Sequence, residues 1–333
     1  MKSMSIMKFG DIDVFEKIIL PKPAVIPGHV LIKVMATSVN PLDYKIREGC
    51  FPDLVTSFPM TLHGDVAGVI EQVGDGVSSF SVGDEVYGCV GGLLDMGGGL
   101  AEYVVADTKL IAHKPETLSL LEAAALPLVA LTAWEGLITQ ANVQKGQTVL
   151  IYGGTGGVGH IAIQLAKYLG ATVCSTSSSS EKRDISKQLG ADFTINYKDS
   201  DVKSWVAEHT NNAGFDVVFD TVGGDNLPAA FDAASLFGKV ITILAAGNYD
   251  LTPAFLKGLT IHTIMQPLPL LTGIRRAHYG DILAKLAALI DNGFIRPLID
   301  KKQFTIDDAG AAHTHLKNGN ALGKVVLAGF QAD

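Results

Sequence analysis

Up to about Pro115 the chain carries short runs in which apolar residues alternate with others at period two. In Val30–Ala36 every second position is apolar, as expected of a strand with one buried face. Val66–Val73 is a second such run, and Val82–Val86 is typical of a turn that enters a strand. Gly, Pro and Asp separate these runs, so we predict an all-β region that forms a partly closed barrel.

From about Val143 the pattern changes to short apolar strands that alternate with helices. The first predicted helix carries Ile161, Leu165 and Leu169 at helical spacing, which indicates one buried stripe. The predicted strands are Thr148–Tyr152, Ala171–Thr176, Phe193–Asn196, Phe215–Asp220, Val240–Leu244 and Leu259–Met265. The later helices are predicted at Glu181–Leu189, Val202–His209 and Leu227–Leu236. Strands alternating with helices in this way predict an α/β domain with a doubly wound parallel sheet.

The order of these patterns suggests a domain that is interrupted by another. A helix is predicted at Ile282–Ile290, ended by Gly293, and short mixed elements follow. We expect residues 1–122 to form the first domain, 123–265 the α/β domain, and 266–333 to return to the first domain. The length of 333 residues fits two domains.

Composition and charge argue against several classes of protein. The net charge is −8 and no block of Lys and Arg occurs, which disfavours a nucleic-acid or anionic-membrane surface. Cys50, Cys89 and Cys174 are scattered, so neither a disulfide framework nor a Cys-x-x-Cys zinc site is expected. Without a signal-like start or a membrane-length apolar run, we expect a soluble, cytoplasmic protein.

A glycine-rich segment carries the strongest chemical signal. It matches Gly-x-Gly-x-x-Gly directly after an apolar strand and opens a helix, which is the context of a dinucleotide-binding loop. Its residues are Gly154, Thr155, Gly156, Gly157, Val158 and Gly159. The glycines allow a tight turn, close approach of a pyrophosphate and close helix packing, and the helix start attracts phosphate. The alternative is a glycine-rich turn that binds nothing.

The residues after the next strand favour NADP(H) over NAD(H). An NAD-selective site places an acidic side chain about 20 residues beyond the first glycine. Here Cys174–Ser178 contains hydroxyls, and Lys182 and Arg183 follow. Hydroxyls and cations suit a 2′-phosphate. Alternatively, Lys182 and Arg183 only solvate the exposed face of a helix.

Several segments together resemble the zinc-independent quinone oxidoreductase and enone (alkenal) reductase branch of the medium-chain dehydrogenases/reductases. Besides the glycine-rich loop, they are Ser38–Asp43, Gly64–Val69, Ser81–Val86, Leu126–Ala133, Asp220–Gly224 and Gly323–Leu327. The resemblance implies a GroES-like β-barrel catalytic domain, a Rossmann domain and an active site in the cleft between them. It also implies NADPH as hydride donor and a homodimer.

The resemblance further assigns positions to the cofactor. Near the nicotinamide it implies Asn40, Pro41, Lys45 and Thr132, and at the pyrophosphate the loop Gly156–Val158. Around the 2′-phosphate it implies Ser177, Lys182 and Tyr197. The rest of the groove would be lined by Thr221, Leu244, Ala245, Ala246, Gly247, Met265, Gln266 and Pro267.

The zinc-ligand positions of metal-dependent relatives are occupied by other residues. Asn40 replaces the usual Cys, Gly64 replaces the usual His, and no Cys lies near Val129. Neutral Asn and Gly do not replace thiolate and imidazole ligands, so we predict no metal.

Four histidines have different expected positions or roles. His63 adjoins the ligand position, and we expect a structural or substrate-side role. His313 and His315 are expected to be an exposed surface pair, and His160 is expected on the helix after the loop.

Without a metal, hydride delivery to an already electrophilic acceptor is the natural reaction. Such acceptors are quinones or the C=C bond of α,β-unsaturated carbonyl compounds. Asn40, Lys45 and Tyr44 are candidate catalytic groups that stabilise developing oxygen charge or donate a proton. The alternative roles are a turn cap for Asn40, a solvated charge for Lys45 and a core position for Tyr44. Classical quinone reductases of the branch carry tyrosines where this chain has Lys45 and Phe51, which favours enones.

Other functions remain open from the sequence. They are a zinc-free alcohol dehydrogenase, an enoyl-thioester reductase, and an NADPH-binding sensor without turnover. The predicted edge strand Leu259–Met265 is the expected dimer contact, because pairing would cover an open sheet edge.

Overall fold

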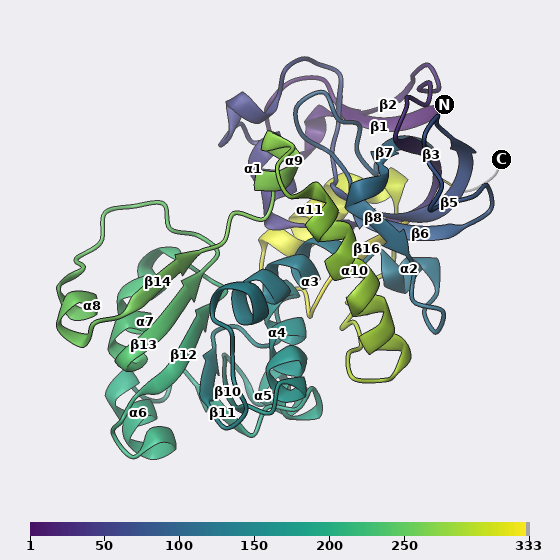
Figure 1. Cartoon of the computed structure of the whole chain (residues 1–333). Coiled ribbons are helices and arrows are strands. Elements are labelled where there is room, and N and C mark those ends of the chain that lie inside the picture. The colour runs from purple at the N-terminus through teal and green to yellow at the C-terminus, as the bar shows by residue number, and fades with distance from the viewer. Residues whose placement is uncertain (331–333) are drawn as a thin grey trace. The chain divides into compact units, whose positions relative to one another are not determined.

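The computed structural model describes residues 1–330, which form two compact units (Figure 1). Unit 1 comprises Met1–Leu128, Pro267–Gly293 and the described part of Pro297–Asp333. Unit 2 comprises Val129–Gln266 and Phe294–Arg296. Among the helices of residues 1–330, none has the length and apolar character needed to cross a bilayer.

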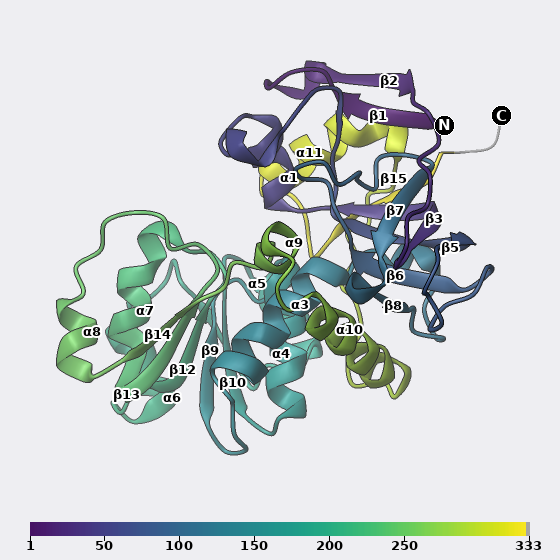
Figure 2. The same ribbon diagram turned by 45° about the horizontal axis from the view of Figure 1, so that its top comes forward.

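Unit 2 contains a six-stranded parallel sheet in the order β11-β10-β9-β12-β13-β14. Its strands are β9 Thr148–Ile151, β10 Thr172–Ser177, β11 Phe193–Asn196, β12 Phe215–Asp220, β13 Ala234–Thr242 and β14 Thr260–Thr263. All six predicted strands are present, and helices flank the sheet on both faces (Figure 2). Burial on both faces explains the short apolar strand sequences. This is a Rossmann fold, as predicted.

The helices of unit 2 follow the predicted alternation. They are α3 Pro127–Trp134 (which starts in unit 1), a π-helix Glu135–Gln140, α4 Gly157–Tyr168, α5 Ser180–Gln188, α6 Val202–Thr210, the 3-10 turn η5 Gly224–Asn226, α7 Leu227–Ala233 and α8 Thr252–Lys257. His160 lies on α4 as expected, and it is buried. The Asp201 side chain accepts the Ser204 amide at the start of α6, which is a standard cap for free helix amides.

The predicted extent of one helix is wrong. The Leu227–Leu236 pattern predicted a helix to Leu236, but α7 ends at Ala233 and Ala234 pairs with Phe215 in the sheet. The ammonium of Lys257 on α8 donates to the carbonyls of Phe231, Asp232 and Ala234 at 3.0, 2.7 and 2.8 Å. These tertiary contacts satisfy the last carbonyls of α7 and end it, which local periodicity does not reveal.

Unit 1 contains the predicted β-barrel-like sheet, with order β15-β16-β3-β5-β6-β8 and with β7 also paired to β3. Its strands are β3 His29–Val39, β5 Asp65–Val73, β6 Glu85–Cys89, β7 Tyr103–Asp107, β8 Ile111–His113, β15 Phe304–Thr305 and β16 Val325–Ala328. A smaller sheet joins β2 Phe15–Ile19, β1 Lys2–Ile6 and β4 Met60–Thr61. The alternating residues of β3 (Val30, Ile32 and Val34) are buried in one apolar cluster, as predicted, but Leu31 between them is buried as well.

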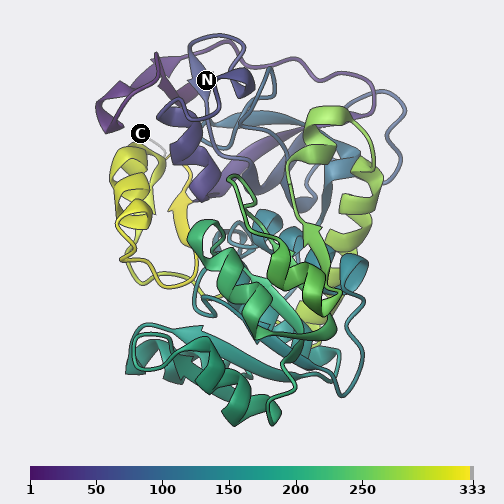
Figure 3. The same ribbon diagram turned by 90° about the vertical axis from the view of Figure 1, so that its left-hand side faces the viewer.

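The helices of unit 1 come from both ends of the sequence. They are α1 Pro41–Arg47, α2 Leu120–Ala123, α9 Leu268–Thr272, α10 Arg276–Asp291 and α11 Ala309–Lys317, with 3-10 turns at Ile12–Val14 (η1), Pro52–Leu54 (η2), Thr108–Leu110 (η3) and Ile306–Asp308 (η6). The helix predicted at Ile282–Ile290 is α10, and the Gly293 amide donates to the Ile290 carbonyl at its end. Figure 3 shows α11, in yellow, beside the purple N-terminal segment, and α11 packs against α1 and η1.

Candidate functional site

The glycine-rich segment forms the turn between β9 and α4. A Cβ at Gly154 would lie 1.9 Å from Oγ of Ser175, and a Cβ at Gly159 would lie 2.2 Å from the Gly153 carbonyl. Packing alone therefore requires glycine at both positions. At Gly156, the N-cap residue, the nearest atom to a Cβ is the Gly153 carbonyl oxygen at 3.2 Å, and the remaining space is open. The amides at the start of α4 are thus accessible to a phosphate group.

The other predicted cofactor positions of unit 2 gather largely at the carboxyl ends of its strands. Ser177 ends β10, and its Oγ is buried without a hydrogen-bond partner among residues 1–330. The amide of Tyr197, beyond β11, donates to the Ser177 carbonyl at 3.3 Å. Lys182 and Arg183 lie in the first turns of α5, whose N-cap is Ser179. A buried, unpartnered hydroxyl, followed in sequence by two cations at the start of the next helix, is a suitable environment for a phosphate.

The remaining positions of unit 2 continue along the same edge. Thr221 follows β12 and donates from Oγ1 to the Tyr152 carbonyl at 2.6 Å. Leu244, Ala245, Ala246 and Gly247 follow β13, while half-exposed Met265 and buried Gln266 follow β14. Thr132 is buried on α3. This edge, outside the carboxyl ends of parallel strands, is where open α/β sheets bind ligands.

Four predicted positions lie together in unit 1, at the start of α1. Asn40 is the N-cap and Pro41 the first helical residue, so the extended strand β3 turns directly into a helix. The Asn40 amide donates to Oδ2 of Asp43 at 2.6 Å. Tyr44 and Lys45 follow on the helix, and both are partly exposed. Burial and the nearby Glu48 carboxylate raise the pKa of Tyr44, which makes it a weaker proton donor. Pro267 is also in unit 1, where it is buried.

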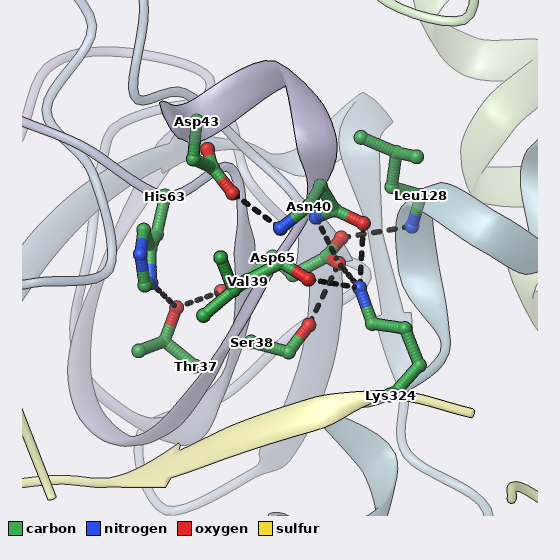
Figure 4. Close-up of polar contacts among 9 residues, drawn as sticks. All are labelled: Thr37, Ser38, Val39, Asn40, Asp43, His63, Asp65, Leu128 and Lys324. Atoms are coloured by element: carbon green, nitrogen blue, oxygen red, sulfur yellow. Dashed lines mark hydrogen bonds and ion pairs between the residues drawn. The ribbon is translucent and has the colours of Figure 1, made fainter. Parts of the chain in front are cut away.

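The Asn40 side chain is part of a buried polar network, shown in Figure 4. Its Nδ2 donates to Oδ2 of Asp65 at 2.8 Å, and its Oδ1 accepts from Nζ of Lys324 at 2.5 Å. Oδ2 of Asp65 also accepts from Ser38 Oγ at 2.9 Å, and Oδ1 accepts from the Leu128 amide at 2.8 Å. Asn40, Asp65 and Lys324 are each at most 2% exposed.

Asp43 occupies an unusual electrostatic position next to this network. Burial raises the pKa of its carboxyl to about 7, although the hydrogen bond that it accepts from the Asn40 backbone amide opposes the shift. The nearby Asp65 carboxylate raises the pKa further, and the Lys324 ammonium lowers it. Asp43 therefore changes protonation near neutral pH within hydrogen-bond distance of the Asn40 backbone.

The structure corrects the expectation for His313. Instead of lying on the surface with His315, it is fully buried and stacks on His63, with 2.8 Å between their Nε2 atoms. His315 instead pairs with Asp300 at 3.1 Å. His63 and His313 fall on one face only through tertiary packing of α11, since 250 residues separate them. Of the two roles expected for His63, structural or substrate-side, the structural one is consistent with this buried pair.

The hydrogen-bond directions in the histidine pair follow from Thr37. Its hydroxyl donates to the Asp65 carbonyl at 2.6 Å, so the same oxygen accepts from Nδ1 of His63 at 3.3 Å. Nε2 of His63 is then the acceptor, and His313 donates to it from Nε2. Nδ1 of His313 has no partner in the described residues. Both rings are neutral, because burial lowers the pKa of His63 well below its usual value and that of His313 to about 3.

We predict that acid destabilises the protein through this pair. Each histidine binds a proton below about pH 6.5 when unfolded but not when folded, so stability is lost as the pH falls, by about 1.4 kcal/mol per pH unit for each. Asp43, with its raised pKa, acts in the opposite direction between about pH 4 and 7. Urea unfolding at pH 7 and 5.5 should show a net loss on acidification. His313→Phe should reduce that loss, whereas His113→Phe, at a side chain that is 59% exposed, should leave it unchanged.

The donor set of unit 1 does not fit a zinc ion. Asn40 and Gly64 stand at the two positions where zinc-dependent relatives carry Cys and His ligands, and Asn40 is held by Asp65 and Lys324. Residues 1–330 contain no cluster of three His, Cys, Asp or Glu side chains that could bind a metal. A neutral amide and a glycine do not supply thiolate or imidazole ligands, so these positions do not fit a zinc ion.

Comparison with known proteins agrees with this geometry. Residues 26–116 match the alcohol dehydrogenase GroES-like domain, and residues 157–269 match a family described as zinc-binding dehydrogenase. A 2-methylene-furan-3-one reductase of Solanum lycopersicum is 35% identical over 98% of this chain and 79% of its own length. The chain belongs to the medium-chain dehydrogenase/reductase superfamily. Its GroES-like unit 1 and Rossmann unit 2 are the two domains of that superfamily.

Two further members show the branch. An NADPH-dependent alkenal/one oxidoreductase of Arabidopsis thaliana, described as chloroplastic, is 33% identical over 98% of this chain and 79% of its own length. The structure of the quinone oxidoreductase from Coxiella burnetii has a TM-score of 0.83 and 33% identity, and covers 98% of this chain and 99% of that chain. Within the superfamily, the chain therefore resembles members named as quinone and alkenal/one oxidoreductases.

Asp65 and Lys324 were not singled out as site residues from the sequence. Both lie within segments that carried the family resemblance, Gly64–Val69 and Gly323–Leu327. The available signal was physical: each is a single charge at the start of a buried apolar strand, and such charges are rarely left unpaired.

Proposed function

We propose that this protein is an NADPH-dependent reductase of the C=C bond of α,β-unsaturated carbonyl compounds or of quinones. The observation that carries the proposal is the Gly154–Gly159 turn, where packing fixes two glycines and leaves open space at Gly156 above the start of α4. Bound NADPH would supply the hydride. The relatives named as alkenal/one, furanone and quinone reductases support the acceptor class.

The residues present fit NADPH in unit 2. The start of α4 offers free amides to the diphosphate, and the buried hydroxyl of Ser177 is an unpartnered group at the predicted 2′-phosphate position. Lys182 lies in the first turn of α5, which follows β10, and Tyr197, which follows β11, donates from its amide to the Ser177 carbonyl. No acidic side chain occurs in Cys174–Ser178 that would repel a 2′-phosphate.

Asn40, Tyr44 and Lys45 would act on the acceptor side of the reaction. An amide hydrogen or the Lys45 ammonium would stabilise negative charge that develops on the acceptor's oxygen. Tyr44 or Lys45 would supply the proton that completes reduction of the C=C bond. The presence of Lys45 and Phe51, where quinone reductases of the branch carry tyrosines, favours an enone or alkenal over a quinone.

The test is NADPH oxidation against a panel of 2-alkenals, cyclic enones, quinones, enoyl-thioesters and simple ketones, with NADH as a second donor. We expect the highest kcat/KM with enones or alkenals and NADPH. A preference for enoyl-thioesters or for simple alcohols and ketones would instead assign an enoyl-thioester reductase or a zinc-free alcohol dehydrogenase. Tight NADPH binding without turnover would indicate a sensor.

A homodimer and a cytoplasmic location belong to the same proposal. The edge strand β14 adjoins an exposed apolar patch, which we define as Leu236, Phe237, Phe255 and Leu256, exposed by 66%, 82%, 81% and 72%. A Cβ at Gly258, the C-cap of α8, would lie 3.1 Å from the Phe237 ring, so β13 and α8 meet at the patch. An open edge beside such a patch is typical of a dimer contact. No disulfide joins the cysteines of residues 1–330, which fits a reducing compartment.

We predict that Phe237→Asp combined with Phe255→Asp yields a monomer. Both side chains are largely exposed in the single chain, so their replacement costs little folding stability but places two charges in the apolar contact. Light scattering should give twice the chain mass for the wild type and the single mass for the variant. Exposed Val82→Asp, in unit 1, is the control and should stay dimeric; a monomeric wild type would contradict the proposal.

A further inference from the structure

Lys324 is a buried lysine whose ammonium is fully engaged. It precedes β16 and is 2% exposed. Its Nζ lies 2.5 Å from Oδ1 of Asn40, 3.0 Å from the Val39 carbonyl and 3.3 Å from Oδ2 of Asp65. Three acceptors match the three hydrogens of an ammonium group.

Stability alone does not account for this arrangement. A buried ion pair contributes little net stability compared with apolar residues of the same volume, because both charges lose their hydration. The Asp65 carboxylate also accepts hydrogen bonds from three donors other than Lys324, namely Ser38 Oγ, the Leu128 amide and Asn40 Nδ2. Lys324 and Asp65 together determine the orientation of the Asn40 side-chain amide, which lies between them.

The two charges fix the orientation of that amide. An ammonium group only donates and a carboxylate only accepts. Oδ1 of Asn40 must therefore face Lys324 and Nδ2 must face Asp65. A flipped amide would place two donors together at the ammonium and two acceptors together at the carboxylate, at separations of 2.5 and 2.8 Å. One Nδ2 hydrogen donates to Asp65, and the second has no acceptor in the described part of the chain.

We propose that Lys324 and Asp65 are positioning residues for the reduction, which hold the Asn40 amide in one orientation so that its second Nδ2 hydrogen donates to the acceptor's oxygen. The inference rests on the proposed function. A donor that is fixed before the reaction stabilises developing oxyanion charge without reorganisation at the moment of hydride transfer. Freed from its two partners, the amide would rotate and lose that advantage.

The test begins with Lys324→Met, which removes the ammonium and keeps an unbranched side chain. We expect kcat with the best acceptor to fall about 100-fold. The KM for NADPH should change less than about twofold, because that cofactor is held through the turn at α4 in unit 2. A second variant, Asp65→Asn with Lys324→Met, removes both charges together and avoids a buried unpaired carboxylate; it should fold and show the same loss of kcat.

A double-mutant cycle separates positioning from a structural role. If Lys324 acts through Asn40, then Asn40→Ala with Lys324→Met should be no slower than Asn40→Ala alone. The matched control is Lys114→Met, at a lysine of unit 1 whose Nζ also donates to two carbonyls, those of Pro115 and Leu118. It should lower the midpoint of unfolding and leave kcat within about twofold of the wild type.

Three outcomes would overturn the inference. The first is an active wild type whose kcat is retained in the double variant Asp65→Asn with Lys324→Met. The second is additive losses in the cycle with Asn40, which would show that the lysine acts independently of the amide. The third is a wild type that oxidises NADPH with no acceptor of the panel; this result also removes the proposed function, whereas the first two leave it intact.

Discussion

The Gly156→Val variant should fold and yet lose at least about 100-fold in affinity for NADPH. Gly156 has an extended backbone that any residue adopts, and a Cβ there would lie 3.2 Å from its nearest neighbour, the Gly153 carbonyl. A Cβ there requires the Gly153 carbonyl to shift by only a few tenths of an ångström, so we expect a valine to be accommodated at a cost of about 1 kcal/mol at a helix N-cap. Its methyl groups occupy the open space above the amides of α4, where the diphosphate is proposed to lie.

Titration of protein fluorescence with NADPH measures this effect. Gly97→Ala is the control, because a Cβ at Gly97 would meet only Cγ2 of Val104 at an ordinary 3.7 Å. Gly154→Val would be a poor substitute for Gly156→Val, since its Cβ would clash with Oγ of Ser175 at 1.9 Å and disturb the fold. Unchanged affinity in a folded Gly156→Val protein would place the dinucleotide elsewhere.

The second large effect is expected at Ser177. Ser177→Asp should raise the KM for NADPH about 100-fold and lower that for NADH, because a carboxylate repels a 2′-phosphate and binds a ribose 2′-hydroxyl. The new charge would lie at the carboxyl end of β10, and Lys182 and Arg183 follow it in the first turn of α5. These cations limit the cost of burying the carboxylate.

The ratio of kcat/KM for NADPH to that for NADH measures this change. Ser177→Ala provides the graded comparison and should reduce the ratio only about tenfold, the value of one hydrogen bond to a charged group. A Ser177→Asp protein that keeps the wild-type ratio would show that the 2′-phosphate is recognised by other residues.

The sequence predicted unit 2 well because its signals are local. Each βα step carries its own strand, turn and helix pattern, so β11 and β12 match the predicted residues at both ends. The glycine-rich turn combines a composition signal with strand and helix context, which is why its residues could be named in advance. The boundary between α7 and β13 was wrong because the Lys257 ammonium that ends the helix comes from α8, more than 20 residues later.

The candidate site in unit 1 depends on contacts that no local pattern contains. Asn40 was named from a resemblance, but no local pattern indicated that Lys324, 284 residues away, would contact it. The pairing of His63 with His313 was missed for the same reason. A histidine in a helical segment has the same local sequence signal whether its side chain is exposed or buried. Antiparallel pairing of β16 with β3 produces the contact with Lys324, and strand pairing is set by the whole domain.

The position of β3 in its sheet has a consequence for synthesis of the chain. β3 pairs with β5 and β7, which are synthesised soon after it, and with β16, which follows it by more than 280 residues. Unit 2 is nearly continuous in sequence and can fold while translation proceeds. Unit 1 must wait with part of the β3 edge unpaired until β16 has been synthesised, and β16 brings Lys324 with it. A nascent or truncated chain would therefore present an aggregation-prone edge beside an incompletely formed site, which makes chaperone dependence a property to look for in cells.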